Sequence, residues 1–529
     1  MVIFTLTAAL VAAAPALQAI EPPPALEPSH QYSVQVDGEA AFVFLATTDG
    51  TNVHQGSFVH IPLHPGATRE VIVTLLERPD PESPSGLWPP AAAALRPEPV
   101  GESSALPTVQ MIRGSGGLKW RFNVSIPLHS VMEFGAAAFH LESFSAGLMV
   151  FADMVDVAAP DPEHLPLGVT YFGPGVHELP LQPGWQTDKG TRGLQLQNHS
   201  TLYLADGAVV LGGIRAFNVM NVTIRGRGII ATAFLTTPSG SQDYCQYCTC
   251  GGNNGIEIEN GTDIMIEGVT VMHATGWDIR LQSLRHVHVK NVKVIAWRCW
   301  NDGIDLVSSQ DVLIEGVFIR SDDDSIAIKG MDPTMDSKNL VVRDSILWNQ
   351  RYGNCMEIGF ELFNAEIYNV TFVRNVCLHQ SGSVMSIHNG GQANVHDVHY
   401  GDIVVQTLNS DPSLNMRGYH AKGCRGNGCL MLFDLSIVWG QYCRVGPPPK
   451  GDGCTDPSLR GEISKISMEN IRVETNGVSF IYAQLGGNSS SHAVHGVTVT
   501  NLTIDGRVAR SLHELNATTN AFVSGVTVQ

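Results

Sequence analysis

Apolar residues recur along the second part of the chain at offsets of zero, two, five and seven, in units of two short runs separated by a bend. The clearest units are Ile264, Ile266, Val269 and Val271, then Val287, Val289, Val292 and Val294, then Val312, Ile314, Val317 and Ile319. Counted from the unit that begins at 264 to the one that begins at 393, the spacings are 23, 25, 28, 25 and 28 residues. Repetition at this period indicates stacked units that bury a shared core.

The residues of these units favour strands. Val and Ile fill the apolar positions, the bends are rich in Asn and Gly, and neither a Leu-x-x-Leu-x-Leu consensus nor a helical return is present. Residues 166–529 are therefore predicted to form the coils of a parallel β-helix, each stacked on the last at about 4.8 Å. An array of β-sandwiches is the alternative, and it would not explain so regular a period.

The chain before residue 166 follows a different pattern. Short alternating runs such as QYSVQV, AFVFLA and RFNVSIPL predict a small β-sandwich over residues 20–165. A stretch rich in Pro, Ala and Glu, near 78–107, breaks this pattern and is expected to be an insertion between strands.

Residues 1–19 are apolar and end in small residues, which predicts a cleaved secretory signal peptide, although no Lys or Arg precedes the apolar run. A buried N-terminal strand is the alternative. Eight Asn-X-Ser/Thr sequons support export and a glycoprotein. No later run is long and apolar enough to span a bilayer, so we expect a secreted protein that is not bound to a membrane.

All ten cysteines lie after residue 244, with close groups at Cys245, Cys248 and Cys250 and at Cys424 and Cys429. In an exported chain this spacing favours disulfides, and zinc is the alternative. The formal charge of −18 and the pI of about 5.5 disfavour nucleic acid as a partner.

Three aspartates are predicted to converge on adjacent coils. The Ile-x-Leu that follows Asp302-Gly303 aligns with the Ile-x-Ile that follows Asp324-Ser325, which places Asp302 and Asp324 in one column, 22 residues apart. Asn354 occupies the same column on the next coil, and Asp323 stands beside Asp324. Like charges this close raise one another's pKa, so at least one of the aspartates should hold a proton near neutral pH.

A protonated carboxyl group beside an ionised one is what glycosidic hydrolysis requires, because one protonates the leaving oxygen while the other acts on water or on the sugar. Two other interpretations remain. The aspartates could cap turns or form a solvated ladder, or they could bind calcium as in a polysaccharide lyase, which would also need a Lys or Arg as base.

The motif pair NDGIDL and DDDSIAIKG resembles the Asn-Thr-Asp-Gly and Asp-Asp-x-x-Ala-Ile motifs of polygalacturonases, glycoside hydrolase family 28. The triple Asp and the preceding sandwich also resemble the dextranase and isopullulanase family. The resemblance covers roughly residues 168–510. It implies a right-handed parallel β-helix and an inverting mechanism, with Asp323 as general acid and with Asp302 and Asp324 activating the attacking water.

Two departures from the polygalacturonase pattern concern the substrate. Gly-His-Gly is replaced by Gly353-Asn354-Cys355, and the two basic residues of Arg-Ile-Lys align with Ser386 and His388. Each lost charge-assisted hydrogen bond to a galacturonate carboxylate is worth about 1.5–3 kcal/mol. The sequence therefore favours a neutral glycan.

The predicted substrate-binding residues surround this column: Asn354, Glu357, Trp277, Trp300, Lys329 and His388. Trp277 and Trp300 could be sugar platforms or packed aromatics, and Glu357 could contact substrate or simply face solvent. We expect a secreted, monomeric, inverting hydrolase of a neutral polysaccharide that needs no cofactor or metal. The alternatives are a polygalacturonase, a non-catalytic glycan-binding β-helix and a calcium-dependent lyase.

Overall fold

The computed structural model describes residues 28–47, 55–77, 90, 92–97, 106–116, 118–134, 147–182, 191–232, 254–272, 274, 276–296, 301–349, 353–363, 366–380, 382–406, 429–437, 460–475 and 480–529. These residues form strands β1 to β43 and contain no helix. It follows that no described segment is a helix of the length and apolarity needed to cross a membrane. The predicted signal peptide and most of the predicted insertion lie outside these ranges.

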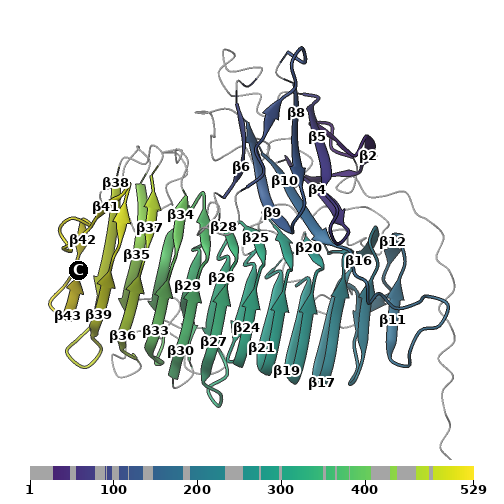
Figure 1. The fold of residues 1–529 in the computed structure, drawn as a ribbon. Helices are drawn as coiled ribbons and strands as arrows, with labels where there is room; N and C mark the ends of the chain where they lie inside the picture. The colour runs from purple at the N-terminus through teal and green to yellow at the C-terminus, as the bar shows by residue number, and fades with distance from the viewer. Residues whose placement is uncertain are drawn as a thin grey trace, which may run out of the picture.

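The first ten strands form two five-stranded sheets, in the orders β2-β1-β5-β8-β7 and β3-β4-β10-β9-β6 (Figure 1). Side chains of β8 alternate between buried and exposed, which gives the sheet one apolar face. Tyr32, Phe122 and Val71 from the first sheet and Val59 and Val150 from the second belong to a single buried cluster. The strands are β1 (Tyr32–Val36), β2 (Glu39–Ala41), β3 (Val43–Thr47), β4 (Gln55–Leu63), β5 (Arg69–Leu75), β6 (Ala93–Arg96), β7 (Gln110–Met111), β8 (Lys119–Val124), β9 (Leu128–Phe134) and β10 (Gly147–Met154). The limits 20–165 and 166–529 for the two domains remain a prediction.

From β11 onward the chain winds into stacked coils (Figure 1). A typical coil has three strands, as in β23 (Ile304–Val307), β24 (Gln310–Glu315) and β25 (Phe318–Ser321), followed by β26 (Ile326–Gly330), β27 (Ser337–Arg343) and β28 (Ile346–Asn349). The first two strands of each coil belong to a 21-stranded sheet and the third to a 12-stranded sheet. Parallel pairing from one coil to the next confirms the predicted parallel β-helix.

The remaining strands complete the coils on either side. Toward the N-terminus they are β11 (Val169–Phe172), β12 (Gly175–Glu178), β13 (Leu181–Gln182), β14 (Thr191–Gln195), β15 (Thr201–Leu204), β16 (Ala208–Leu211), β17 (Gly213–Gly226), β18 (Ile229–Ala231), β19 (Ile256–Glu267), β20 (Thr270–Met272), β21 (Ile279–Lys290) and β22 (Lys293–Ile295). Toward the C-terminus they are β29 (Met356–Leu362), β30 (Glu366–Val373), β31 (Val376–Leu378), β32 (Ser383–Asn389), β33 (Asn394–Gly401), β34 (Val404–Gln406), β35 (Cys429–Ile437), β36 (Ile463–Glu469), β37 (Arg472–Glu474), β38 (Phe480–Gly486), β39 (Val494–Thr500), β40 (Thr503–Ile504), β41 (Arg507–Val508), β42 (Ala517–Thr518) and β43 (Val523–Val528).

The register of the apolar repeat agrees with the sequence pattern over most coils and slips once. Ile264, Val287, Val312 and Leu340 pair in succession, as predicted. Leu340 then pairs with Val370, so the units predicted at 365 and 393 were placed five residues too early. Ile367, Val370 and Phe372 satisfy the last three offsets of the pattern, but β30 extends upstream and Val370 occupies the first position.

A column of residues with left-handed backbone stands directly before the first apolar residue of successive repeat units, as Asp311 does before Val312 in β24. Their φ angles lie between 52° and 59°, a region that Asn and Asp tolerate better than other non-glycine residues. The members are Asn221, Asp263, His286, Asp311, Asn339, Asn369 and Asp397. This backbone requirement accounts for the frequent Asn and Asp residues directly before the apolar units.

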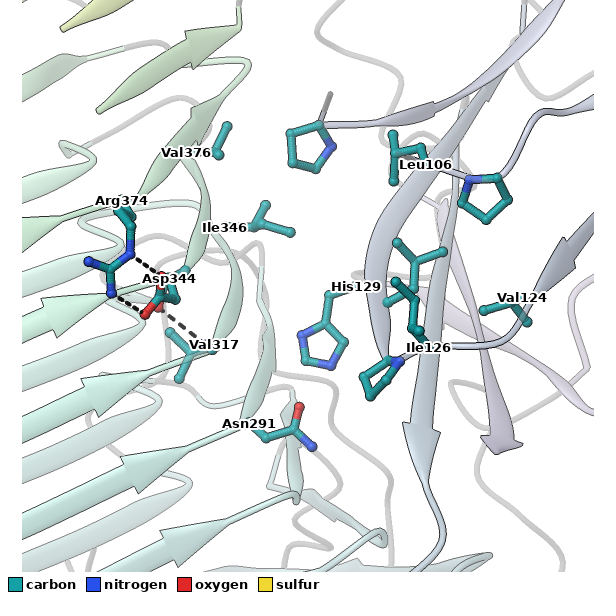
Figure 2. Close-up of a pocket in the computed structure, with 16 residues that line it drawn as sticks. Leu106, Val124, Ile126, His129, Asn291, Val317, Asp344, Ile346, Arg374 and Val376 are labelled. Carbon is teal, nitrogen blue, oxygen red and sulfur yellow. Dashed lines mark hydrogen bonds and ion pairs between the residues drawn. The ribbon is translucent and has the colours of Figure 1, made fainter. Parts of the chain in front are cut away.

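The N-terminal unit packs against the 12-stranded sheet. Phe58 and Phe151 of this unit join Ile295 and Phe318 of the coils in a separate buried cluster, and the rings of Phe151 and Phe318 lie 5.0 Å apart. Beside this cluster a cavity of about 390 Å³ separates the two units. Figure 2 shows His129 of the N-terminal unit in this cavity, with Ile346, Val317 and Asn291 of the coils on the opposite wall.

One described disulfide lies inside the helix. Cys355 and Cys377 join within one coil, and both side chains are fully buried. This bond confirms a disulfide in the chain. Cys245, Cys248, Cys250 and Cys424 lie outside the described residues.

Candidate active site

Asp302, Asp324 and Asn354 share one column, as predicted. Ile304 pairs with Ile326, and Ile326 pairs with Met356, so the residues two positions before each strand lie side by side. Backbone hydrogen bonds continue the pairing before the strands begin: Gly303 N donates to Asp324 O and Ser325 N to Asn354 O, each at 2.8 Å. By the same register Trp277 stands one coil before Asp302.

Asp302 lies in a buried ion cluster. Lys329 Nζ is 3.3 Å from Asp302 Oδ2, 3.6 Å from Asp305 Oδ1 and 3.2 Å from Glu361 Oε2. Although burial disfavours charge on Lys329, the charges of Glu361, Asp302 and Asp305 raise its pKa well above the usual value. One fixed cation therefore balances several carboxyl groups beside Asp302.

Asp324 is held by the next coil. Its Oδ1 accepts hydrogen bonds from Asn354 N at 2.6 Å and from Asn354 Nδ2 at 3.0 Å. Asn354 Oδ1 in turn accepts from Ser383 N at 2.9 Å. Two donors on one carboxylate oxygen fix its orientation and favour its ionised form.

Asp323 is anchored through its backbone rather than through its carboxyl group. Its carbonyl oxygen accepts hydrogen bonds from Ser321 Oγ at 2.8 Å and from Asn349 Nδ2 at 2.6 Å. Asp324 N donates to its Oδ1 at 3.0 Å, and the side chain is only partly buried. Asp323 is thus the most accessible of the three predicted catalytic aspartates.

The three aspartates differ in how their surroundings shift their pKa values. Burial, together with the charge of Asp302, raises the pKa of Asp323 well above its usual value. Burial and the charges of Glu357 and Asp302 do the same for the pKa of Asp324. Burial also raises the pKa of Asp302, but Lys329 acts against that rise. These shifts favour the protonated forms of Asp323 and Asp324, and Asp302, beside Lys329, is the one of the three aspartates best able to stay ionised.

The turn that carries Asp302 is fixed by its neighbour Asn301. Asn301 Nδ2 donates to the carbonyl oxygens of Ala274 and Gly276 on the preceding coil, at 2.8 and 2.6 Å. The side chain is fully buried. An amide group that bridges two carbonyls explains why Asn precedes Asp302 in the motif.

Glu357 and His388 lie on the strands that follow. Glu357 pairs with Ala327 on one side and with Ser386 on the other. His388 Nδ1 is 2.9 Å from Glu357 Oε2, and its Nε2 is 3.1 Å from Asp434 Oδ2. All of these side chains are buried, so His388 contacts carboxylates inside the protein.

Trp277 is partly buried and lies next to the cation of the cluster. Lys329 Nζ is 4.7 Å from the centre of the Trp277 ring, and the guanidinium carbon of Arg280 is 6.0 Å from it. A cation at such a distance from the centre of an aromatic ring is attracted to the face of the ring. Trp300, the other predicted aromatic, lies outside the described residues.

Asp305, Glu361 and Asp434 belong to these clusters and were absent from the predicted site. Asp305 stands inside the first motif, three residues after Asp302, and its side chain is fully buried. Burial, and then the charge of Asp302, raises the pKa of Asp305 well above its usual value. The motif itself was the signal that could have identified it. Across the ranges that the structure describes, no group of three His, Cys, Asp or Glu side chains is arranged to hold a metal ion.

No protein-family model matches the chain, and a search of curated protein sequences finds no relative. Solved structures do resemble it. Dex49A, a dextranase from Penicillium minioluteum, aligns with a TM-score of 0.50 and 13% identity, covering 95% of both chains. A family 28 exopolygalacturonase from Yersinia enterocolitica aligns at 0.44 and 10%, covering 86% of this chain and 96% of that one. An exopolygalacturonase from Thermotoga maritima aligns at 0.43 and 14%, covering 68% and 84%. The chain therefore has the right-handed parallel β-helix fold that is found in Dex49A.

Proposed function

We propose that the protein is a glycoside hydrolase that cleaves O-glycosidic bonds in a polysaccharide. The observation that carries the proposal is the register that brings Asp302 beside Asp324, with Asp323 adjacent and Lys329 3.3 Å from Asp302. Carboxyl groups whose environments drive their pKa values apart are suited to separate acid and base roles. The fold shared with Dex49A supports the same activity.

Asp323 is the proposed general acid. Its pKa is raised well above the usual value, first by burial and then by Asp302, and it is more accessible than its neighbours. A proton retained at neutral pH can be given to the leaving oxygen of the glycosidic bond.

Asp302 and Asp324 are the proposed activators of the attacking water. Lys329 stabilises the ionised form of Asp302, and the two donors from Asn354 stabilise that of Asp324. A water molecule placed between them would lose its proton to one carboxylate as it attacks the anomeric carbon. Because water is then the direct nucleophile, we propose that the configuration of the sugar is inverted.

The charged residues around the three aspartates favour a neutral glycan. Lys329 is ion-paired with three carboxyl groups, and His388 lies between two more. Cations that are already paired do not offer a charge-assisted hydrogen bond to the carboxylate of a uronic acid. A chain without carboxylates, such as an α-glucan, avoids repulsion by the acidic cluster.

We further propose that the protein is secreted. The apolar first 19 residues, the eight sequons and the Cys355–Cys377 disulfide support export to an oxidising compartment.

Hydrolysis of a panel of polysaccharides tests the proposal. We expect reducing sugar to be released from dextran or another neutral glucan in preference to polygalacturonate, and NMR of the first products should show the inverted anomer. Asp323→Asn should lower the rate by about 10²- to 10⁴-fold, because the general acid is lost. Asp311→Asn, at an exposed bend, is the matched control and should keep full activity.

Other outcomes would replace the proposal. Full activity in Asp323→Asn contradicts the assigned role, and preference for polygalacturonate contradicts the neutral substrate. An unsaturated product that absorbs in the ultraviolet and disappears with chelator identifies a lyase. Binding of a glycan without any product identifies a non-catalytic protein.

A further inference from the structure

Both ring nitrogens of His388 face carboxylates. Nδ1 is 2.9 and 3.0 Å from the two oxygens of Glu357, and Nε2 is 3.1 Å from Asp434 Oδ2. A neutral imidazole has one N–H donor, so a ring with a carboxylate at each nitrogen is satisfied only as an imidazolium. A flip of the ring would place Cδ2 and Cε1 against the two carboxylates, so these contacts favour the orientation in which both nitrogens face them.

The surroundings of the ring support a permanent charge. All three side chains are fully buried. Burial alone would lower the pKa of His388, but Glu357 and Asp434 raise it well above the usual value. The ring of Phe360 stacks on the imidazole at 4.6 Å and 3°, and the hydroxyls of Ser386 and Ser436 donate to Glu357 and Asp434.

This arrangement reaches the proposed active site through Glu357. Glu357 pairs with Ala327, three residues after Asp324. After burial, the charge of Glu357 is the largest cause of the raised pKa of Asp324. The imidazolium beside Glu357 offsets that charge, so the ionisation of Asp324 is sensitive to a side chain two coils away.

We propose that His388 is a positioning residue that acts through Glu357 to keep Asp324 ionised. The inference rests on the proposed function only for the role of Asp324; the coupling itself concerns ionisation and can be measured without substrate. His388 is then no contact for the glycan. It sets the lowest pH at which Asp324 can accept a proton from water.

Other charged groups face this arrangement and are unchanged in the test. Besides Glu357, those that face Asp324 are Asp302, Asp323 and Lys329. Those that face the two partners of His388 are Tyr400 on β33, beside Glu357, and Tyr482 on β38, beside Asp434.

The titration of Asp324 tests the proposal directly. Protein labelled with ¹³C in its aspartate carboxyl groups is followed by NMR against pH, and the Asp324 signal is assigned by its loss in Asp324→Asn. In His388→Gln we expect the midpoint of Asp324 to rise by about one pH unit, because the positive charge that offsets Glu357 is removed. Glu357→Gln should lower the midpoint.

The double variant Glu357→Gln/His388→Gln removes both charges and should return the midpoint close to that of the wild type. His396→Gln is the matched control, because His396 lies on β33 and pairs with the exposed Asp397. An unchanged midpoint in His388→Gln, whatever its thermal stability, overturns the proposal. A double variant that stays shifted like His388→Gln also overturns it, since the effect would not then run through Glu357.

Activity adds a second readout that separates this inference from the proposed function. The acidic limb of the pH profile of kcat/KM should move in each variant in the same direction as the midpoint of Asp324. If the wild type cleaves no polysaccharide, the proposed function fails while the NMR titration still decides the coupling.

Discussion

Gly353 stands where two of the proposed catalytic residues leave no room for a side chain. A Cβ added there would lie 2.2 Å from Asp324 N and 2.5 Å from Asp323 Oδ1. Its φ of 67° also belongs to the left-handed region that glycine adopts at little cost. The residue therefore has a steric role at the site in addition to its role in the turn.

Gly353→Ala is expected to lower activity by at least ten-fold, because Asp323 and Asp324 must shift to admit the methyl group. The matched control is Gly316→Ala, whose φ of 62° imposes a similar backbone strain but whose Cβ would meet no atom within 4 Å. Both variants should lose about 1–2 kcal/mol of stability from the left-handed backbone. Hydrolysis rates and thermal unfolding measured in parallel separate the two effects, and equal activity in both variants would contradict the steric role.

The sequence could identify those site residues whose position follows from strand register. Asp302, Asp324 and Asn354 each stand two residues before a strand with clear apolar alternation, so the column can be counted from the motif. Glu361 could not be found in this way, because the register shifts between Ile328 and Gly330 and adds residues before Leu362.

The position of Asp434 on β35 could not be counted from the repeat either. The sequence between Gln406, where β34 ends, and Cys429, where β35 begins, contains no unit of the apolar repeat from which to count. The pairing of Ser386 with Asp434 is a property of the folded coils and has no counterpart in local sequence spacing.

At the scale of elements, side chains of the left-handed column form a ladder of hydrogen bonds along the β-helix. Asn369 Nδ2 donates to Asn339 Oδ1, and Asn339 Nδ2 donates to Asp311 Oδ1, both at 2.7 Å. Each of the three residues has left-handed φ. Asn339 therefore combines a tolerated backbone conformation with two hydrogen bonds between coils.

Asn339→Ala should be more destabilising than Asn339→Gly. Both lose the two hydrogen bonds, each worth about 0.5–1.5 kcal/mol. Only the alanine variant must also place a Cβ in the left-handed region, which costs about 1–2 kcal/mol more. Thermal unfolding should rank the wild type above the glycine variant and the glycine variant above the alanine variant; a glycine variant that is the less stable of the two would contradict the backbone argument.

Strand β30 also shows where the apolar pattern fails to predict the register. The repeat could be counted correctly as far as Leu340, because each coil up to there has one apolar unit at the expected spacing. It slipped where β30 began upstream at Glu366 and presented a third apolar residue, Ile367, at a spacing that the pattern also allows. An apolar template of four positions cannot tell an extended strand from the start of a new unit.

At the scale of the whole molecule, a buried polar cluster joins the N-terminal unit to the coils. Lys293 Nζ donates to Asp153 Oδ2 at 2.7 Å, and Asn291 Nδ2 donates to Asp153 Oδ1 at 2.8 Å. His129 Nε2 lies 3.2 Å from the same oxygen of Asp153 and borders the cavity between the units (Figure 2). His60 lines cavities on the other side of the cluster.

These two histidines make the contact between the units sensitive to acid. Burial, then the charge of Lys293, lowers the pKa of His60 to about 3. Burial also lowers the pKa of His129, against the pull of Asp153. Both rings therefore bind protons less readily in the folded protein than in the unfolded chain, where histidines take up protons below about pH 6.5.

Stability should fall on acidification as a consequence. Above about pH 6.5 neither state takes up these protons, and their contribution is fully present; below it, the unfolded chain binds more protons, and each neutral histidine costs about 1.4 kcal/mol per pH unit until its folded pKa is reached. Thermal unfolding between pH 7.5 and 5 should show this loss in the wild type and a smaller loss in His60→Gln/His129→Gln. His164→Gln, at a histidine that is 80% exposed, should follow the wild type. Parallel curves for all three proteins would mean that acid acts elsewhere, whereas a flatter curve for the double variant alone assigns the acid sensitivity to the contact between the N-terminal unit and the β-helix.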